Sequence, residues 1–245
     1  MTDRKERDLK LFSVFAGVFT AALVLVPSTA SKFIAIGSHN VPGGTLIFPL
    51  TFIINDILTE VYGYERSRRI IWTGMACQAL AALVYWIVDI WPPAPIWHEQ
   101  QAYHTILASA PRITLASLSA YFCGEFTNSV IVSKMKYGQR GAHGFAQAWR
   151  FVASTIVGEL VDSVIFMSVG FLGVFASIEV VKTIVMLWIA KVVYEIVALP
   201  FSIPFANWVK RVEGIDQIDD PQHTRYNPFA AFFRESTSQA PSRPQ

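Results

Sequence analysis

Seven ionisable residues lie inside otherwise apolar stretches of the chain, where a charge needs a partner or a ligand. They are Asp56, Glu60, Glu125, Glu159, Asp162, Lys191 and Glu195. A charged side chain that faces lipid costs about 2.5 to 3.5 kcal/mol on insertion scales, so these residues are expected to face the interior of a helical bundle. Acids in excess over lysine at such a place favour bound protons, a cationic ligand or a hydrogen-bond donor edge.

Helical spacing groups several of these residues on common faces. Asp56 and Glu60 are one turn apart, and so are Lys191 and Glu195, so each pair shares a helix face. Two structural alternatives stay open at this point. Lys191 and Glu195 could form a simple internal ion pair, and Glu60 could lie in the headgroup layer of a membrane.

A short internal similarity links two of the apolar stretches. Residues 124–131 read GEFTNSVI and residues 158–165 read GELVDSVI, so five of eight positions match. In each stretch the Glu is followed three residues later by a second polar residue, Asn128 in the first and Asp162 in the second. Because neighbouring membrane helices run antiparallel, the similarity would be an inverted relation of the kind found in transporters, with chance similarity as the alternative.

Motifs of known enzyme classes do not occur in the sequence, which has no HExxH, GxSxG, Walker loop or GxGD. The two cysteines lack the spacing of a metal site, so neither a metal nor another cofactor is expected. An intramembrane enzyme would have to rely on a pair of acids such as Asp56 and Asp162. The net charge of +2 gives no reason to expect a nucleic-acid partner.

The composition around these residues indicates a membrane protein. It is 53% apolar and only 16% charged, against about 25% in soluble domains, and the mean hydropathy is +0.39. A crossing needs about 20 mainly apolar residues. Six segments qualify, near residues 11–31, 44–63, 70–91, 113–132, 151–175 and 183–207. The predicted fold class is an all-α polytopic membrane protein with six transmembrane helices.

Basic residues alternate between the connections of these segments. The N-terminus, the second and fourth connections and the stretch after the sixth segment are rich in Lys and Arg, whereas the others hold one each: Lys32, Arg112 and Lys182. Basic residues concentrate on the cytoplasmic side, so both termini are expected there. The predicted organisation is a cytoplasmic N-terminus at residues 1–10, a membrane domain at 11–211 and a disordered cytoplasmic tail at 212–245.

The run FPLTFIINDILTEVYG at residues 48–63, with Arg66, Arg68 and Arg69 behind it, resembles the signature of the queuosine precursor transporter family within the vitamin uptake transporters. Later stretches are similar to the same family in the same order, so the resemblance covers residues 11–211. Members of that family are expected to carry Gln at the positions of Glu125 and Glu159, each followed three residues later by Asp. Asp162 matches that pattern, whereas Asn128 departs from it.

The resemblance implies a six-helix importer in the bacterial inner membrane for deazaguanine bases with a cyano or aminomethyl group, which are salvaged for tRNA modification. Its fold would be similar to the substrate-binding components of energy-coupling-factor importers, and transport would be secondary or facilitated, with proton coupling open. The expected substrate-binding residues are Asn55, Asp56, Glu60, Glu125, Asn128, Glu159, Asp162, Lys191, Tyr194 and Glu195.

The donor edge of a guanine-like base matches a carboxylate such as Glu125 or Glu159, which agrees with that implication. Two rival functions remain: a substrate-binding module of an ATP-driven vitamin or nucleobase importer, and an intramembrane enzyme. Small-residue helix faces permit a homodimer without requiring one.

Overall fold

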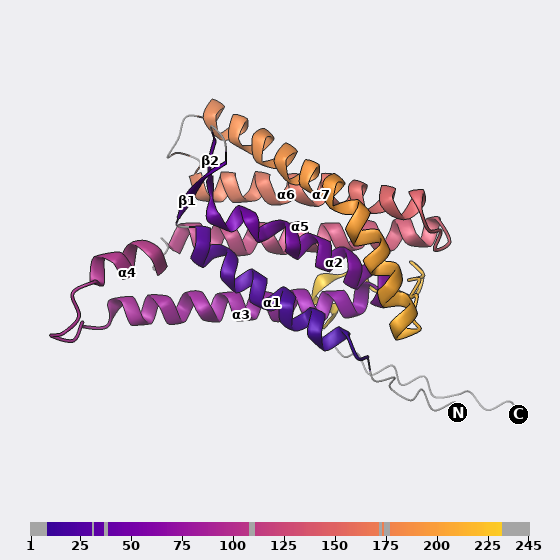
Figure 1. Ribbon diagram of the computed structural model, residues 1–245, viewed down its shortest axis with the longest axis horizontal. Coiled ribbons are helices and arrows are strands. Elements are labelled where there is room, and N and C mark those ends of the chain that lie inside the picture. Colours follow the sequence, from indigo (N-terminus) through magenta and orange to yellow (C-terminus); the bar gives the residue numbers. More distant parts are fainter. Residues whose placement is uncertain are drawn as a thin grey trace, which may run out of the picture.

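The computed structural model describes residues 9–30, 32–36, 39–107, 111–171, 173 and 177–231, which form an elongated helical bundle (Figure 1). The α-helices are α1 (Phe12–Ala30), α2 (Phe48–Tyr62), α3 (Tyr64–Ile90), α4 (Gln100–Leu107), α5 (Pro111–Gly138), α6 (Phe145–Phe171) and α7 (Ser177–Glu213). Short 3-10 helices lie at η1 (Gly43–Leu46) and η2 (Pro228–Ala231), and a hairpin is formed by β1 (Phe33–Ile36) and β2 (His39–Pro42).

Four of these helices are long and apolar enough to cross a bilayer. The qualifying segments are Phe12–Thr29, Tyr64–Ile90, Phe145–Phe171 and Val180–Glu213. Large apolar side chains on these helices are exposed, among them Trp86 at 49%, Val197 at 65% and Phe201 at 77%. Extended apolar surfaces of this kind suit lipid rather than water. The chain is therefore a helical membrane protein that crosses the bilayer several times.

The six segments predicted from the sequence coincide in position with α1, α2, α3, α5, α6 and α7. Of these six helices, α2 and α5 are not among the four that qualify, and they differ from ordinary spans. α2 has 15 residues and is about 22 Å long, shorter than a hydrocarbon core of about 30 Å. Most of α2 is buried by protein, so its polar residues avoid lipid. α5 has 28 residues but is more polar than the four, because it carries Glu125, Asn128 and several Ser and Thr side chains around mid-length.

Helix α2 lies inside the bundle, in contact with α1, α3, α5 and α7, while α5 and α6 pack along most of their length and α7 covers α6 (Figure 1). One end of the bundle holds the start of α1 and the last turn of α7. We call it the terminal end. α2 and α5 also end there, and α3 and α6 begin there. An apolar core of residues such as Phe19, Leu58, Ile71 and Val209 holds α1, α2, α3 and α7 together.

The opposite end carries elements that the hydropathy pattern did not predict. β1 and β2 form an antiparallel hairpin between α1 and α2, with Phe33 paired to Pro42 and Ile36 to His39. The short helix α4 lies in the connection between α3 and α5, where Gln100 and His104 contact the Asp89 carboxylate at 3.2 and 2.7 Å. The hairpin and α4 therefore form part of the α1–α2 and α3–α5 connections, outside the bundle of long helices.

The residues after α7 differ from the disordered tail expected from residue 212. α7 continues to Glu213, and residues 214–231 turn back onto the terminal end. Arg68 Nη1 donates to the carbonyl oxygens of Arg225 and Asn227 at 2.7 and 3.0 Å, and Trp72 Nε1 donates to that of Pro228 at 2.9 Å. Side chains of α3 thus satisfy backbone carbonyls that polar composition alone would leave to water. Residues 1–8 and 232–245 lie outside the described residues.

Candidate functional site

Two glycines set the distance between α5 and α6 in the middle of the bundle. A Cβ atom at Gly124 would lie 3.2 Å from the Gly158 carbonyl oxygen and 2.9 Å from Asp162 Cβ. A Cβ atom at Gly158 would lie 3.1 Å from the Gly124 carbonyl oxygen and 3.0 Å from Asn128 Cβ. Gly124 therefore packs against Gly158 and Asp162, and Gly158 packs against Gly124 and Asn128. The similarity of residues 124–131 and 158–165 corresponds to an antiparallel, nearly two-fold helix crossing.

The α5 side of this crossing contacts α2. Asn55 Nδ2 donates to Glu125 Oε2 at 2.6 Å, and Asn128 Nδ2 donates to Asp56 Oδ1 at 2.5 Å. All four side chains are fully buried. The short helix α2 positions Asn55 and Asp56 because it lies against α5, whose Glu125 and Asn128 are three residues apart and share one helix face.

The α6 side of the crossing contacts α7 through a lysine. Lys191 Nζ lies 2.6 Å from Glu159 Oε2 and 2.7 Å from Asp162 Oδ2. The same ammonium group lies 4.0 Å from the centroid of the Phe48 ring, at the start of α2. Two carboxylates and an aromatic face therefore surround one cation, which offsets the cost of holding it inside the bundle.

Several buried oxygen atoms at the crossing have no hydrogen-bond partner among the residues that the structure describes. They are Asp56 Oδ2, Glu125 Oε1, Asn128 Oδ1 and Glu195 Oε1. Glu195 of α7 is only 2% exposed, and its carboxylate acts electrostatically on Asp56. A buried acceptor without a donor costs about 1 to 3 kcal/mol, and more when it is charged. The arrangement thus suits a ligand that brings hydrogen-bond donors or positive charge.

Glu60, predicted to share the site, instead contacts basic residues one helical turn nearer the terminal end. Arg150 holds both carboxylate oxygens, with Nε 2.7 Å from Oε2 and Nη2 bonded to Oε1. Lys210 Nζ lies 2.5 Å from Oε1, and Lys136 Nζ donates to the Glu60 carbonyl oxygen. We call Glu60, Lys136, Arg150, Lys210 and Asp216 the terminal cluster. Its geometry is that of a closed ion-pair network, not of an open binding site.

Asp216 completes the terminal cluster from the segment after α7. It accepts from Lys136, and its Oδ1 lies 3.0 Å from Lys210 Nζ. Burial would raise the pKa of Asp216, but the hydrogen bonds and positive charges of Lys136 and Lys210 hold that pKa below its usual value. The same network therefore fastens the C-terminal segment to α5 and α7.

Two further expectations differ from what the structure shows. Tyr194 is 44% exposed, so it lies on the outer face of α7 rather than at the crossing. Lys191 pairs with Glu159 and Asp162, not with Glu195 of its own helix. The alternative of a simple ion pair between Lys191 and Glu195 is therefore wrong, although both residues do lie at the crossing.

Sequence reasoning missed residues that position the acids. Ser67 at the start of α3 is fully buried and donates to Asn55 Oδ1 at 2.7 Å. Lys136, Arg150 and Lys210 mark the cytoplasmic side in the sequence, yet their charged groups turn inward to Glu60. A serine or a basic residue at a helix end gives no signal of such contacts, because the partner lies far away in the sequence.

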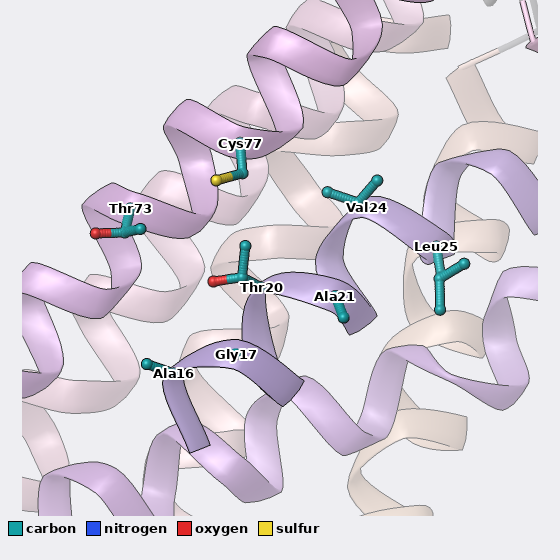
Figure 2. Close-up of a pocket in the computed structure, with 8 residues that line it drawn as sticks. All are labelled: Ala16, Gly17, Thr20, Ala21, Val24, Leu25, Thr73 and Cys77. Carbon is teal, nitrogen blue, oxygen red and sulfur yellow. The ribbon is translucent and has the colours of Figure 1, made fainter. Parts of the chain in front are cut away.

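A separate hollow lies away from this crossing. It is an open groove of about 700 Å³ between α1 and α3, lined by small and apolar side chains (Figure 2). The lining residues are Ala16, Gly17, Thr20, Ala21, Val24, Leu25, Thr73 and Cys77. No described residue comes within 4 Å of a Cβ atom built at Gly17. The groove is almost wholly apolar, so it suits a lipid chain and not a polar ligand.

The described residues contain no group of three or more His, Cys, Asp and Glu side chains arranged to hold a metal ion. The contacts described at the crossing are hydrogen bonds and ion pairs. Such a site can bind and release a polar ligand between helices.

Comparison with known proteins identifies a family and two relatives. Residues 42–205 match the model of a family described as "Putative vitamin uptake transporter". A Bacillus subtilis (strain 168) protein named "Probable queuosine precursor transporter" is 26% identical over 160 residues, which cover 65% of this chain and 69% of that protein. A Haemophilus influenzae protein of the same name is 23% identical over 172 residues, covering 66% and 68%. No solved structure matches significantly.

The family match extends over more than half of the chain and includes α2, α3, α5, α6 and most of α7. These helices hold the polar crossing and Glu60, Lys136 and Arg150 of the terminal cluster, whereas Lys210 and Asp216 lie beyond the matched residues. This multi-pass membrane protein therefore belongs to the vitamin uptake transporter family.

Proposed function

We propose that this chain imports queuosine precursor bases, 7-deazaguanines with a cyano or aminomethyl group, across a bacterial inner membrane. The observation that carries the proposal is the set of buried acceptor atoms without partners in the described structure, on Asp56, Glu125, Asn128 and Glu195. The names of the two relatives point to the same class of substrate. The acceptors explain why such a substrate would bind inside an otherwise apolar bundle.

Donor groups on a guanine-like base complement these acceptors. Its N1–H and exocyclic amine are parallel donors, which match a carboxylate in a bidentate manner. Glu125 Oε1 and Asp56 Oδ2 are carboxylate oxygens on the α2–α5 side that find no donor among the described residues. A protonated aminomethyl group would add a charge that a second acid stabilises. Lys191 already satisfies much of the α6–α7 side, so we assign that side a supporting role.

The topology that we propose has six crossing segments, α1, α2, α3, α5, α6 and α7, with the terminal end in the cytoplasm. Among the described residues, Lys10, Arg66, Arg68, Lys136, Arg140 and Lys210 lie near that end, which supports this orientation by the positive-inside rule. α2 would be a short segment enclosed by the others. A bundle of this kind would be similar to the substrate-binding components of energy-coupling-factor importers.

Transport would be secondary or facilitated, with access exchanged between the two sides around the crossing. Carboxylates outnumber the lysine there, so a proton could accompany the substrate. An ATP-driven importer would need a separate ATPase partner, and an enzyme would alter the base. Transport without either is the simplest function for this site, and a homodimer is compatible with it.

Uptake of labelled cyano- and aminomethyl-deazaguanine by cells whose only transporter for these bases is this chain tests the proposal. Wild type is expected to show saturable uptake of at least one base, and Glu125→Ala to lose it. Glu99→Ala is the matched control, because Glu99 is exposed outside the long helices. Absence of uptake by a folded, inserted wild type would refute the proposed substrate, and uptake retained by Glu125→Ala would refute the site.

A further inference from the structure

Asn55 stands at the centre of a hydrogen-bond network that joins three helices. Its amide nitrogen Nδ2 donates to Glu125 Oε2 at 2.6 Å and reaches the Glu125 carbonyl oxygen at 3.4 Å. Its oxygen Oδ1 accepts from Ser67 Oγ of α3 at 2.7 Å and from Ser129 Oγ of α5 at 3.1 Å. Asn55, Ser67, Glu125 and Ser129 are all fully buried, so water does not compete for these bonds.

This network determines which way the amide of Asn55 points. Two hydroxyl groups donate to Oδ1, and Thr59 Oγ1 donates in turn to Ser129 Oγ at 3.3 Å, which leaves the Ser129 proton for Asn55. The reversed amide would set two oxygens 2.6 Å apart at Glu125, which is repulsive. Asn55 therefore presents its NH₂ group to residue 125 and requires an acceptor there.

We propose that Asn55 is a positioning residue that fixes which atom of residue 125 the transported ligand meets. Because Glu125 Oε2 is held by Asn55, Oε1 is the oxygen that remains without a donor among the described residues. The site thereby presents an acceptor, and it selects ligands that bring a donor to that point. This inference rests on the proposed function for its ligand, but the orientation of residue 125 is a property of the protein alone.

This orientation predicts what happens when the amide at position 55 or the carboxylate at position 125 is exchanged for the other group. In Glu125→Gln the Asn55 NH₂ group still needs an acceptor, so the introduced glutamine would turn its oxygen to Asn55 and its NH₂ group toward the ligand. The site would then offer a donor where it had offered an acceptor. In Asn55→Asp two carboxylates would meet. In the double variant the introduced aspartate would accept from the introduced glutamine, whose oxygen would again face the ligand.

The test combines thermal unfolding of the purified proteins with uptake kinetics of the labelled deazaguanines. Glu125→Gln is expected to keep the melting temperature of wild type and to raise KM about tenfold or more, since a buried donor would oppose the ligand's donors. Asn55→Asp is expected to lower the melting temperature. Asn55→Asp with Glu125→Gln is expected to recover both the melting temperature and a KM within about threefold of wild type. Glu99→Gln serves as the control.

Two results would overturn the inference. One is an unchanged KM in a folded Glu125→Gln protein, which would mean that residue 125 does not meet the ligand. The other is additivity of the two substitutions in the melting temperature, which would mean that Asn55 does not set the orientation of residue 125. Absence of uptake by wild type would refute the proposed function instead, while the unfolding series would still decide whether Asn55 orients residue 125.

Discussion

Asn128 of α5 and Asp162 of α6 occupy equivalent positions in the two similar stretches, yet they bind different helices. Asn128 Nδ2 donates to Asp56 of α2 at 2.5 Å, whereas Asp162 Oδ2 accepts from Lys191 of α7 at 2.7 Å. The inverted helix pair thus presents one polar face to α2 and the other to α7. A change in how α5 and α6 cross would alter both sets of contacts, as the proposed exchange of access requires.

The close crossing of α5 and α6 predicts that glycine is required at two positions. Gly124→Ala or Gly158→Ala should lower the free energy of unfolding by about 1 to 3 kcal/mol, because the added methyl group meets the facing helix. Thermal unfolding of the purified variants measures this. Gly17→Ala is the control, since its methyl group would meet no atom within 4 Å in the described structure, and it should be neutral or slightly stabilising. Equal stability of all three variants would contradict the crossing.

The terminal cluster predicts a large effect of removing one charge. Arg150→Ala should lower the free energy of unfolding by about 3 to 5 kcal/mol, because Glu60 would lose its bidentate partner while staying buried. Arg150→Lys should recover part of the loss. Arg69→Ala, which removes an exposed arginine from the start of α3, should have little effect. Similar stability of the Arg150 and Arg69 variants, measured by thermal unfolding, would argue against the cluster.

The segment after α7 predicts a helix-capping role for a residue far from the helix it caps. Asp219 Oδ2 accepts from the backbone N–H of Tyr64, the first residue of α3, and from Ser133 Oγ, each at 2.7 Å. Asp219→Ala should therefore cost about 1 to 2 kcal/mol of stability. Asp220→Ala should cost less, because the Asp220 carboxylate bonds Gln222 within its own exposed turn. Limited proteolysis after α7 should also become faster in the Asp219 variant alone.

The lowered pKa of Asp216 predicts a pH dependence with a defined sign. A carboxylate whose pKa is lower in the folded protein stabilises it above the usual pKa of about 3.9, and that contribution is lost as the pH falls through the folded value. Wild type should therefore melt at a higher temperature than Asp216→Asn at pH 7, and the difference should shrink below about pH 4. A difference that stays constant over this range would show that the Asp216 charge does not contribute.

The positions of the long helices could be predicted from the sequence because their signal is local. Apolar length placed six segments that coincide with helices, although α3, α5, α6 and α7 each extend about six residues beyond at least one predicted end. The hairpin at Phe33–Pro42 and the packing of residues 214–231 could not be predicted in this way. The hairpin depends on backbone pairing between its own two short strands, and residues 214–231 depend on hydrogen bonds from distant side chains of α3. Hydropathy carries no information about either set of partners.

The burial of the acids in the apolar segments was predictable from the sequence, but their division between two sets of contacts was not. Asp56 and Glu60 share a face of α2, and spacing alone makes them one site. The structure separates them because Arg150, ninety positions away from Glu60, reaches that carboxylate, whereas Asn128 reaches Asp56. The roles of Ser67 and Asn55 likewise follow from hydrogen-bond direction, which only the three-dimensional arrangement defines.

We propose that this chain alone transports a donor-bearing deazaguanine through its buried crossing. Uptake of labelled base into liposomes that contain the purified protein and no ATPase tests it most directly, with Glu125→Ala and Glu99→Ala beside wild type. Saturable uptake is expected for wild type and Glu99→Ala, and none for Glu125→Ala. Uptake by none of the three folded proteins would contradict the claim, and so would equal uptake by all three.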